Sequence, residues 1–419
     1  MYLGDYLHHK DRYIDGSETW KPLLLNNKDR FRHVYASGQT GVGKSTFIVR
    51  VALDDIAKGE GVMVFDPHGD LIEDILLRIP PERRDDVVLF DASDREYSPS
   101  FNPFADIPKE LRANVADSLV DAMKSVTGYS DVNTSVLDRV LGNGARIVLD
   151  TPTGSFIDLY YLLINSDHRK ALLRHCKDEV IRTFWRREIG DMIPKEQRQY
   201  FQSTLNNFDQ FVTDPTFRHI FGQHHSKIDL SEIMDKSKIL LVKLPIGHLG
   251  HKKASMIGAL ILSLLHSTAI RRKNRKPFHL FIDEFSYFGS LTVQQMLSGI
   301  RKYGVSLTIL QQYSAQVGED MLSAIWGNVG TLMSFRAGLE DEALLKSQFN
   351  LEPKDKLSEL DPFTAFVRTT DTHFLKLPDI SKVTQSGQAD YIRRRSRELY
   401  CRDSEQVRLA LNAYIRKMP

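Results

Sequence analysis

Between residues 38 and 45 the chain reads Gly38-Gln39-Thr40-Gly41-Val42-Gly43-Lys44-Ser45, and Thr46 follows. This stretch fits the pattern G-x-x-x-x-G-K-[ST] at every required position. An apolar run precedes it and apolar residues at helical spacing follow it, so a strand, a glycine-rich turn and a helix are expected in that order. In such a turn, successive backbone N–H groups and the helix N-terminus face an anion. The sequence therefore predicts a phosphate-binding loop, with Lys44 on the β- and γ-phosphates of a nucleotide and Ser45 on Mg²⁺.

Seven short apolar runs recur along the chain between helical patterns, and most of them end in a polar or acidic residue. Strands that are buried on both faces of a parallel sheet have this nearly continuous apolar character. The runs are Arg32 to Ser37, Val62 to Asp66, Val87 to Phe90, Ile239 to Leu244, His279 to Asp283, Ser306 to Leu310 and Thr331 to Arg336. They predict an α/β fold with a doubly wound, mainly parallel sheet.

The strand pattern is interrupted between about Pro108 and Asp235, where the periodicity becomes helical. We predict an inserted all-α subdomain over residues 108–235, which divides the nucleotide-binding domain into residues 1–107 and 236–376. The last segment, 377–419, predicts a tail with one amphipathic helix over Glu398 to Ile415.

Two adjacent acids, Asp283 and Glu284, end the apolar run that begins at Phe278. This position predicts that both lie at the carboxyl edge of the sheet, beside the phosphate-binding loop. We expect Asp283 to be the metal partner and Glu284 to be the base or positioner of the attacking water. Asp66 and Asp91 also end apolar runs and compete for the metal role, but neither is followed by a second acid.

The overall composition excludes only a few functional classes of protein. With 56 Lys and Arg against 54 Asp and Glu, the formal net charge is +2, so a general polycation is excluded and contacts with nucleic acid need local basic clusters. Two such clusters are Arg271 to Lys276 and Arg393 to Arg397. The two cysteines have no metal-ligand spacing, and no export signal is seen, so a cytoplasmic location is expected. The longest apolar stretch, Ile257 to Ile270, is interrupted by polar residues and predicts a buried helix.

Several further motifs carry a family resemblance over most of the chain. They are Phe65-Asp66-Pro67-His68-Gly69-Asp70, Phe101-Asn102-Pro103-Phe104, Gly299-Ile300-Arg301-Lys302-Tyr303-Gly304 and Gln311-Gln312. With the two nucleotide motifs, they resemble the FtsK/HerA superfamily of ring-forming, DNA-pumping P-loop ATPases, and more narrowly the type IV secretion coupling ATPases of the TraG/TraD group. The resemblance implies a RecA-like core that uses ATP and Mg²⁺, DNA as partner, and assembly into a hexameric ring.

The resemblance also implies roles for three residues. Gln312 looks like the family's sensor glutamine, which reports the γ-phosphate. Arg301 lies where the family has an arginine that reaches the nucleotide of a neighbouring subunit, and Arg336 is a second candidate for that arginine. A guanidinium at the γ-phosphate stabilises charge in the transition state and links hydrolysis to subunit contact.

The implied function is an ATP-driven DNA translocase for conjugative transfer or related DNA processing. The helical insertion resembles the all-α domain that coupling ATPases use for recognition, so a protein partner is expected there. Family members usually carry N-terminal membrane helices and none is seen in this sequence, so membrane contact is expected only through another protein. Two alternatives stay open: a HerA-like cytosolic translocase in repair or defence, and a nucleotide-dependent switch or assembly ATPase that acts on a protein partner.

Overall fold

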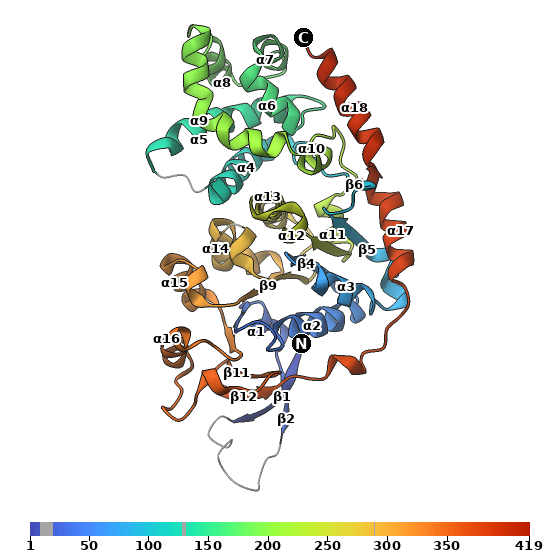
Figure 1. Cartoon of the computed structure of the whole chain (residues 1–419), viewed down its shortest axis with the longest axis vertical. Helices are drawn as coiled ribbons and strands as arrows, with labels where there is room; N and C mark the ends of the chain where they lie inside the picture. The colour runs from blue at the N-terminus through green and yellow to red at the C-terminus, as the bar shows by residue number, and fades with distance from the viewer. Residues whose placement is uncertain (9–19, 128–130, 289) are drawn as a thin grey trace. The chain divides into compact units, whose positions relative to one another are not determined.

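The computed structural model describes residues 1–8, 20–127, 131–288 and 290–419, which form two compact units (Figure 1). The first unit comprises Met1–Phe90, Ser231–Pro245 and Ala269–Arg395. The second comprises Asp91–Leu230, Ile246–Thr268 and Ser396–Pro419. The chain passes between them several times, so each unit is built from segments that are distant in sequence.

One mixed sheet of eleven strands organises the first unit, in the order β2-β1-β12-β11-β10-β3-β9-β8-β4-β7-β5. Neighbouring strands from β10 to β7 run parallel, whereas β11, β12, β1 and β2 pair antiparallel. The bounds are β1 Tyr2–His8, β2 Lys21–Leu24, β3 Val34–Ser37, β4 Gly61–Asp66, β5 Val87–Asp91, β7 Ile239–Lys243, β8 Phe278–Ile282, β9 Val305–Gln311, β10 Thr331–Ser334, β11 Thr364–Arg368 and β12 Thr372–Lys376.

The predicted α/β fold with a mainly parallel sheet is confirmed, and each of the seven predicted strands is present. The four antiparallel strands were not predicted. They extend the sheet beyond β10, and the edge strand β2 carries Pro22 and exposes three of its four residues.

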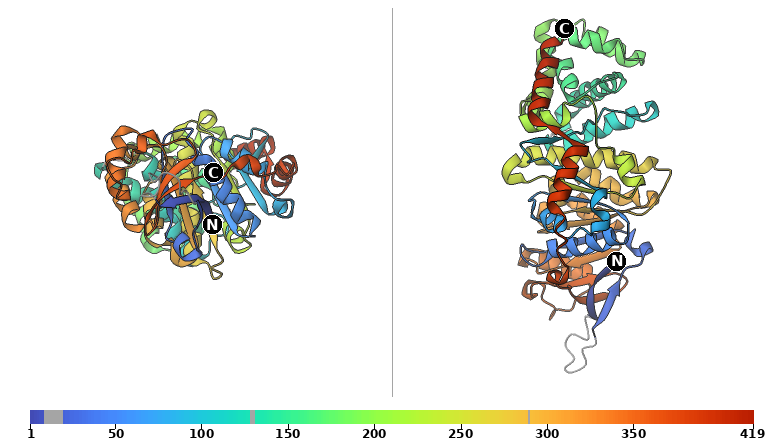
Figure 2. Two further views of the ribbon diagram at one scale, coloured as in Figure 1. Left: turned by 90° about the horizontal axis from the view of Figure 1, so that it is seen from below. Right: turned by 90° about the vertical axis from the view of Figure 1, so that its right-hand side faces the viewer.

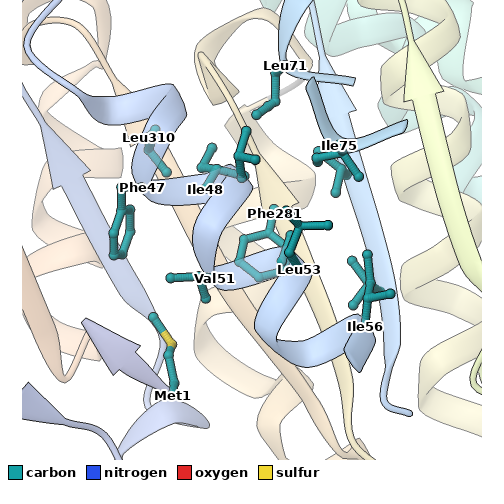
Figure 3. Packing of buried hydrophobic residues seen from close by; sticks show 14 of the residues in the cluster. Met1, Phe47, Ile48, Val51, Leu53, Ile56, Leu71, Ile75, Phe281 and Leu310 are labelled. Carbon is teal, nitrogen blue, oxygen red and sulfur yellow. The ribbon is translucent and has the colours of Figure 1, made fainter. Parts of the chain in front are cut away.

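Helices cover both faces of this sheet (Figures 1 and 2). On one face, α2 packs Phe47, Ile48 and Val51 against Phe281 of β8 and Leu310 of β9 (Figure 3). These side chains are at most 1% exposed, as expected for the apolar stripe of a helix that covers a sheet. On the opposite face, the ring of Tyr35 meets Trp326 of α15 edge to face, with 5.7 Å between the ring centroids. The helices of this unit are α1 Asn27–Arg30, α2 Lys44–Ala57, α3 Asp70–Leu76, α14 Ser290–Gly299, α15 Glu319–Asn328 and α16 Leu339–Phe349.

The second unit is mostly helical and has an aromatic core, in which Phe156 stacks on Phe208 and meets Phe217 edge to face. Its helices are α4 Arg112–Thr127, α5 Asp131–Asp150, α6 Phe156–Ile164, α7 Ser166–Leu173, α8 Glu179–Thr183, α9 Pro194–Val212, α10 Pro215–Phe221, α12 Ile246–Leu249 and α18 Ser404–Lys417. The remaining helices cross the unit boundaries: α11 Leu230–Asp235, α13 His251–Arg271 and α17 Ala389–Tyr400.

The domain boundaries differ from the predicted ones. The second unit begins at Asp91 rather than near residue 108, and it also takes in the C-terminal residues from Ser396. In place of one helix over Glu398 to Ile415, the tail has α17 and α18 with a short strand between them, β13 (Cys401–Asp403). The break occurs because β13 pairs with β6 (Tyr97–Pro99) and because the Asp403 side chain caps α18 by accepting from Gln406 N.

Within the described residues, α13 alone has the length and composition of a membrane-spanning helix. Of its most apolar window, 78% is buried inside the protein, as in the core helix of a soluble fold. It contains the stretch Ile257 to Ile270, which was predicted to form a buried helix.

Candidate nucleotide-binding site

The phosphate-binding loop leaves the carboxyl end of β3 and is held between the two neighbouring strands. Gly38 N donates to Gln311 O of β9 at 3.3 Å, and Gln39 N donates to Arg336 O after β10 at 2.8 Å. Gly43, with φ of 109°, is the last residue before α2. A Cβ there would lie 2.9 Å from the ring of Phe363, so both the backbone conformation and the space require glycine.

Lys44 begins α2 and turns back over the loop, where its Nζ donates to Gly38 O at 2.6 Å and to Gln39 O at 2.9 Å. The residue is 6% exposed. Burial lowers the pKa of Lys44, while the charges of Glu284 and Asp283 oppose that shift. The ammonium group is thus positioned at the loop and lies within electrostatic reach of both acids. Ser45 is exposed at the first turn of α2, where its hydroxyl is accessible.

The acid pair follows β8 directly. Asp283 N donates to Phe65 O at 3.1 Å. Asp283 is 5% exposed and Glu284 is 3% exposed. Glu284 has a φ of 48°, a left-handed conformation that is uncommon for a residue with a side chain and is found at functional turns. Because β3 and β8 both flank β9 in parallel, this turn and the phosphate-binding loop share the carboxyl edge of the sheet.

Both acids titrate above their ordinary range. Burial, then the charges of Glu284 and Asp66, raise the pKa of Asp283 to about 7, against an opposing effect of Lys44. Burial also raises the pKa of Glu284, which hydrogen bonding to Gln312 and the charge of Lys44 oppose. Asp283 Oδ1 and Glu284 Oε2 have no hydrogen-bond partner within the described residues. Buried carboxylate oxygens without partners are costly, and a divalent cation and its water would satisfy them, so the donor set fits Mg²⁺.

The two competing aspartates have structural partners. Asp66 is fully buried and accepts from His68 N at 2.8 Å and from Ile72 N at 3.0 Å, which fixes the turn into α3. Asp91 accepts from Ser93 N at 2.9 Å, in the turn after the edge strand β5. These contacts favour Asp283 as the metal partner.

Gln312 is the first residue after β9 and interacts with Glu284, so the predicted sensor lies at the acid pair. Its neighbour Gln311 has a role that the sequence analysis missed. The Gln311 side chain is fully buried, accepts from Ser286 N at 3.3 Å and donates to Ser286 Oγ at 3.1 Å. It thereby fixes the turn that follows Glu284. The adjacent pair of glutamines at a strand end was the available signal.

The two candidate arginines lie at opposite edges of the sheet. Arg336 follows β10 beside the phosphate-binding loop of its own chain, and its Nε donates to Leu360 O at 2.8 Å. Arg301 lies in the 3₁₀ turn Ile300–Tyr303, just before β9 begins, and its side chain is exposed. It is therefore far from the nucleotide loop of its own chain and accessible to another molecule. Their catalytic roles stay predictions.

Replacing Asp283 tests the electrostatics of the site without any ligand. A carboxyl with a raised pKa favours the folded state below about pH 4, and this contribution is lost as the pH rises through about 7. We expect Asp283→Asn to stabilise the nucleotide-free protein at pH 8 by roughly 2–4 kcal/mol, and by much less at pH 5. Chemical denaturation across this pH range measures the difference. Asp361→Asn makes the same chemical change at an exposed position and is the matched control, and a pH profile of Asp283→Asn that coincides with that of Asp361→Asn would contradict the buried-acid assignment.

Comparison with known proteins identifies a family and solved structures with a similar fold. The family model for the type IV secretion-system coupling protein DNA-binding domain matches residues 22–349. The plasmid coupling protein TrwB, in complex with the GTP analogue GDPNP, has a TM-score of 0.63 at 13% identity, over 93% of this chain and 97% of that chain. TrwB in complex with ADP and Mg²⁺ gives a TM-score of 0.62 at 13% identity, with the same coverage. VirB4 of Thermoanaerobacter pseudethanolicus gives 0.60 at 14% identity, over 92% and 98%.

At these identities the likeness to solved structures establishes the fold, and no curated protein matches the sequence. The family match covers more than half of the chain and includes both nucleotide motifs. The chain therefore belongs to the type IV secretion-system coupling protein family and has its RecA-like P-loop ATPase fold.

Proposed function

We propose that this chain hydrolyses ATP with Mg²⁺ and, as a head-to-tail ring of copies, uses the energy to move DNA. The observation that carries the proposal is the meeting of Lys44 with Asp283 and Glu284 at one buried edge of the sheet, in a chain of the coupling-protein family. TrwB, which shares the fold, has been solved with ADP and Mg²⁺ and with a non-hydrolysable ATP analogue, and this supports the choice of nucleotide.

The residues of the site have separate roles in hydrolysis. The loop from Gly38 to Thr46 would surround the phosphates with N–H groups, and Lys44 would neutralise charge on the β- and γ-phosphates. Ser45 and ionised Asp283 would hold Mg²⁺, which neutralises the phosphate oxygens when it is bound. Because the pKa of Asp283 is raised to about 7, the carboxyl must give up a proton before it can serve.

Glu284 is assigned to orient and deprotonate the attacking water, since a raised pKa makes a carboxylate a better proton acceptor. Gln312 hydrogen-bonds to Glu284, and as the sensor glutamine it would report the γ-phosphate. The proposal also includes a hexameric ring, a protein partner bound by the helical unit, and membrane contact through another protein.

The two basic clusters are not assigned to DNA. Arg272 is 5% exposed and donates to Met234 O and Lys276 O, so it holds a turn. In the second cluster, Arg393 pairs with Glu73, and Arg397 pairs with Asp94 at 2.7 Å. A guanidinium group that already binds a carboxylate or a carbonyl is less available to bind the phosphates of DNA.

ATP hydrolysis with and without single- and double-stranded DNA, measured while the oligomer mass is monitored, tests the proposal. We expect DNA to raise the hydrolysis rate severalfold in assembled protein, and the DNA affinity to fall steeply between about 50 and 200 mM salt because counterions are released. Lys44→Ala is the control and should be inactive with or without DNA. A chain that hydrolyses ATP as a monomer and does not respond to DNA would favour the nucleotide switch instead.

A further inference from the structure

A half-exposed aromatic ring, that of Phe363, lies against the phosphate-binding loop. Phe363 N donates to Val42 O at 2.8 Å, and Phe363 O accepts from Leu377 N at 2.8 Å, so its backbone is tied both to the loop and to the segment after β12. A Cβ on Gly43 would lie 2.9 Å from Cδ1 of Phe363 and 3.4 Å from Cδ1 of Leu377. The ring therefore packs directly on the end of the loop, yet 47% of the residue is exposed.

The backbone at Phe363 has a conformation that disfavours a side chain. Its φ is 63°, in the left-handed region. Thr364 N donates to Asp361 O at 3.2 Å, which closes a four-residue turn with Pro362 second and Phe363 third. In a turn with proline second and a left-handed residue third, the third residue is normally glycine or asparagine. Phenylalanine there costs stability, which its half-exposed ring recovers only in part, and residues held in this way cluster at functional sites.

Phe363 lies on the side of the loop that is remote from the acid pair. Because β11 pairs antiparallel with β10, and β10 runs parallel to β3, the turn before β11 is at the carboxyl edge of the sheet, as the loop is. In the order β11-β10-β3-β9-β8, the acids follow β8 on one side of β3, and Phe363 precedes β11 on the other. At about 4.8 Å between neighbouring strands, each lies roughly 10 Å from β3. A nucleotide whose γ-phosphate faces the acids therefore has its base on the side of Phe363.

A second exposed ring, that of Tyr313, lies near the other end of the site. Tyr313 is 48% exposed, and with Gln39 and Gln312 it lines a groove of about 1050 Å³. Because Gln312 interacts with Glu284, this part of the groove belongs to the γ-phosphate end. The φ of Tyr313 is −150°, which is ordinary extended backbone. Position and backbone conformation therefore both favour Phe363 over Tyr313 as the ring that meets the base.

We propose that Phe363 is the platform on which the nucleobase of ATP stacks when the phosphates occupy the phosphate-binding loop. The inference rests on the proposed function and deepens it, since the phosphates and the metal have assigned residues and the base has none. An aromatic ring offers a flat apolar face and binds none of the hydrogen-bonding groups on the edge of a base. Phe363 thus holds the base by its face, and the turn from Asp361 to Thr364 fixes the ring in place before the nucleotide arrives.

Two ligands that differ by the base test this assignment. Dilute protein with Mg²⁺ is titrated with a non-hydrolysable ATP analogue and, separately, with inorganic tripolyphosphate, which has the phosphates and no base. In Phe363→Ala, affinity for the analogue is expected to fall about tenfold or more, the usual effect of removing a ring under a base, while affinity for tripolyphosphate should change by less than about twofold. Phe363→Tyr keeps the ring and should retain both affinities.

Tyr313→Ala is the matched control, because it removes a ring of similar exposure at the other end of the site. It should keep the ratio of the two affinities that the parent chain has. Equal losses for the analogue and for tripolyphosphate in Phe363→Ala would show that the ring only supports the loop, and the proposal would be wrong. A change of the ratio in Tyr313→Ala with none in Phe363→Ala would place the base in the groove and would also overturn it.

A base of DNA is the competing occupant of this ring. If Phe363→Ala keeps its affinity for the ATP analogue and loses affinity for a labelled single-stranded oligonucleotide, the ring binds DNA and the proposal is wrong. The proposed function can fail separately. A parent chain that binds the analogue through Phe363 but does not hydrolyse ATP would support the platform and overturn only that function. Unchanged analogue affinity in Phe363→Ala, with a parent chain that hydrolyses ATP, would overturn only the platform.

Discussion

Glu284→Gln is expected to bind ATP normally and to hydrolyse it about 10²–10⁴-fold more slowly, because an amide cannot accept the proton of the attacking water. The substitution keeps the size of the side chain and leaves the interaction with Gln312 possible. It also removes a charge that raises the pKa of Asp283, so Asp283 should ionise more readily and nucleotide retention should not suffer. Nucleotide affinity and single-turnover hydrolysis measure the two effects separately.

Glu82→Gln provides the matched control, since it makes the same chemical change at an exposed position in the turn before β5. Its hydrolysis rate should equal that of the parent chain. Normal turnover in Glu284→Gln would remove this residue from the mechanism, whereas loss of ATP binding would show that it supports the fold of the site instead.

Arg301→Ala is expected to lower hydrolysis by about 10³-fold or more in assembled protein, the usual effect of removing an arginine that stabilises the transferring phosphoryl group. ATP affinity of a single copy should not change, because Arg301 lies at the opposite edge of the sheet from the nucleotide loop of its own chain. The hydrolysis rate at concentrations that support assembly tests the first expectation. The ATP affinity measured in dilute protein tests the second.

Arg336→Ala is the informative comparison. Arg336 lies beside its own phosphate-binding loop, so its loss should weaken nucleotide affinity even in dilute protein. A full hydrolysis rate in assembled Arg301→Ala protein would exclude the role in trans, and equal defects in the two variants would show that their positions do not separate their functions.

Sequence reasoning predicted the central sheet and the acid pair because both depend on local pattern. A buried parallel strand is apolar throughout, and an acid at its end must lie at the edge of the sheet, so Asp283 could be placed beside Lys44 from sequence alone. The break between α17 and α18 at Cys401 could not be predicted from sequence, since it depends on pairing with Tyr97–Pro99, about three hundred residues earlier.

The antiparallel part of the sheet was missed for a related reason. Strand β11 joins the sheet only because it folds back antiparallel onto β10, and strands such as Thr364–Arg368 are too short to stand out by composition. Gln311 was quoted in a motif, but its role depends on which of two adjacent side chains faces Ser286, which a sequence does not reveal.

The proline in the edge strand β2 has a consequence for how molecules can aggregate. Pro22 has no N–H to offer, so another polypeptide cannot extend the sheet there by full strand addition. Open-ended growth into fibres through that edge of the sheet is therefore disfavoured. Any assembly of copies would therefore have to form through surfaces other than this edge of the sheet.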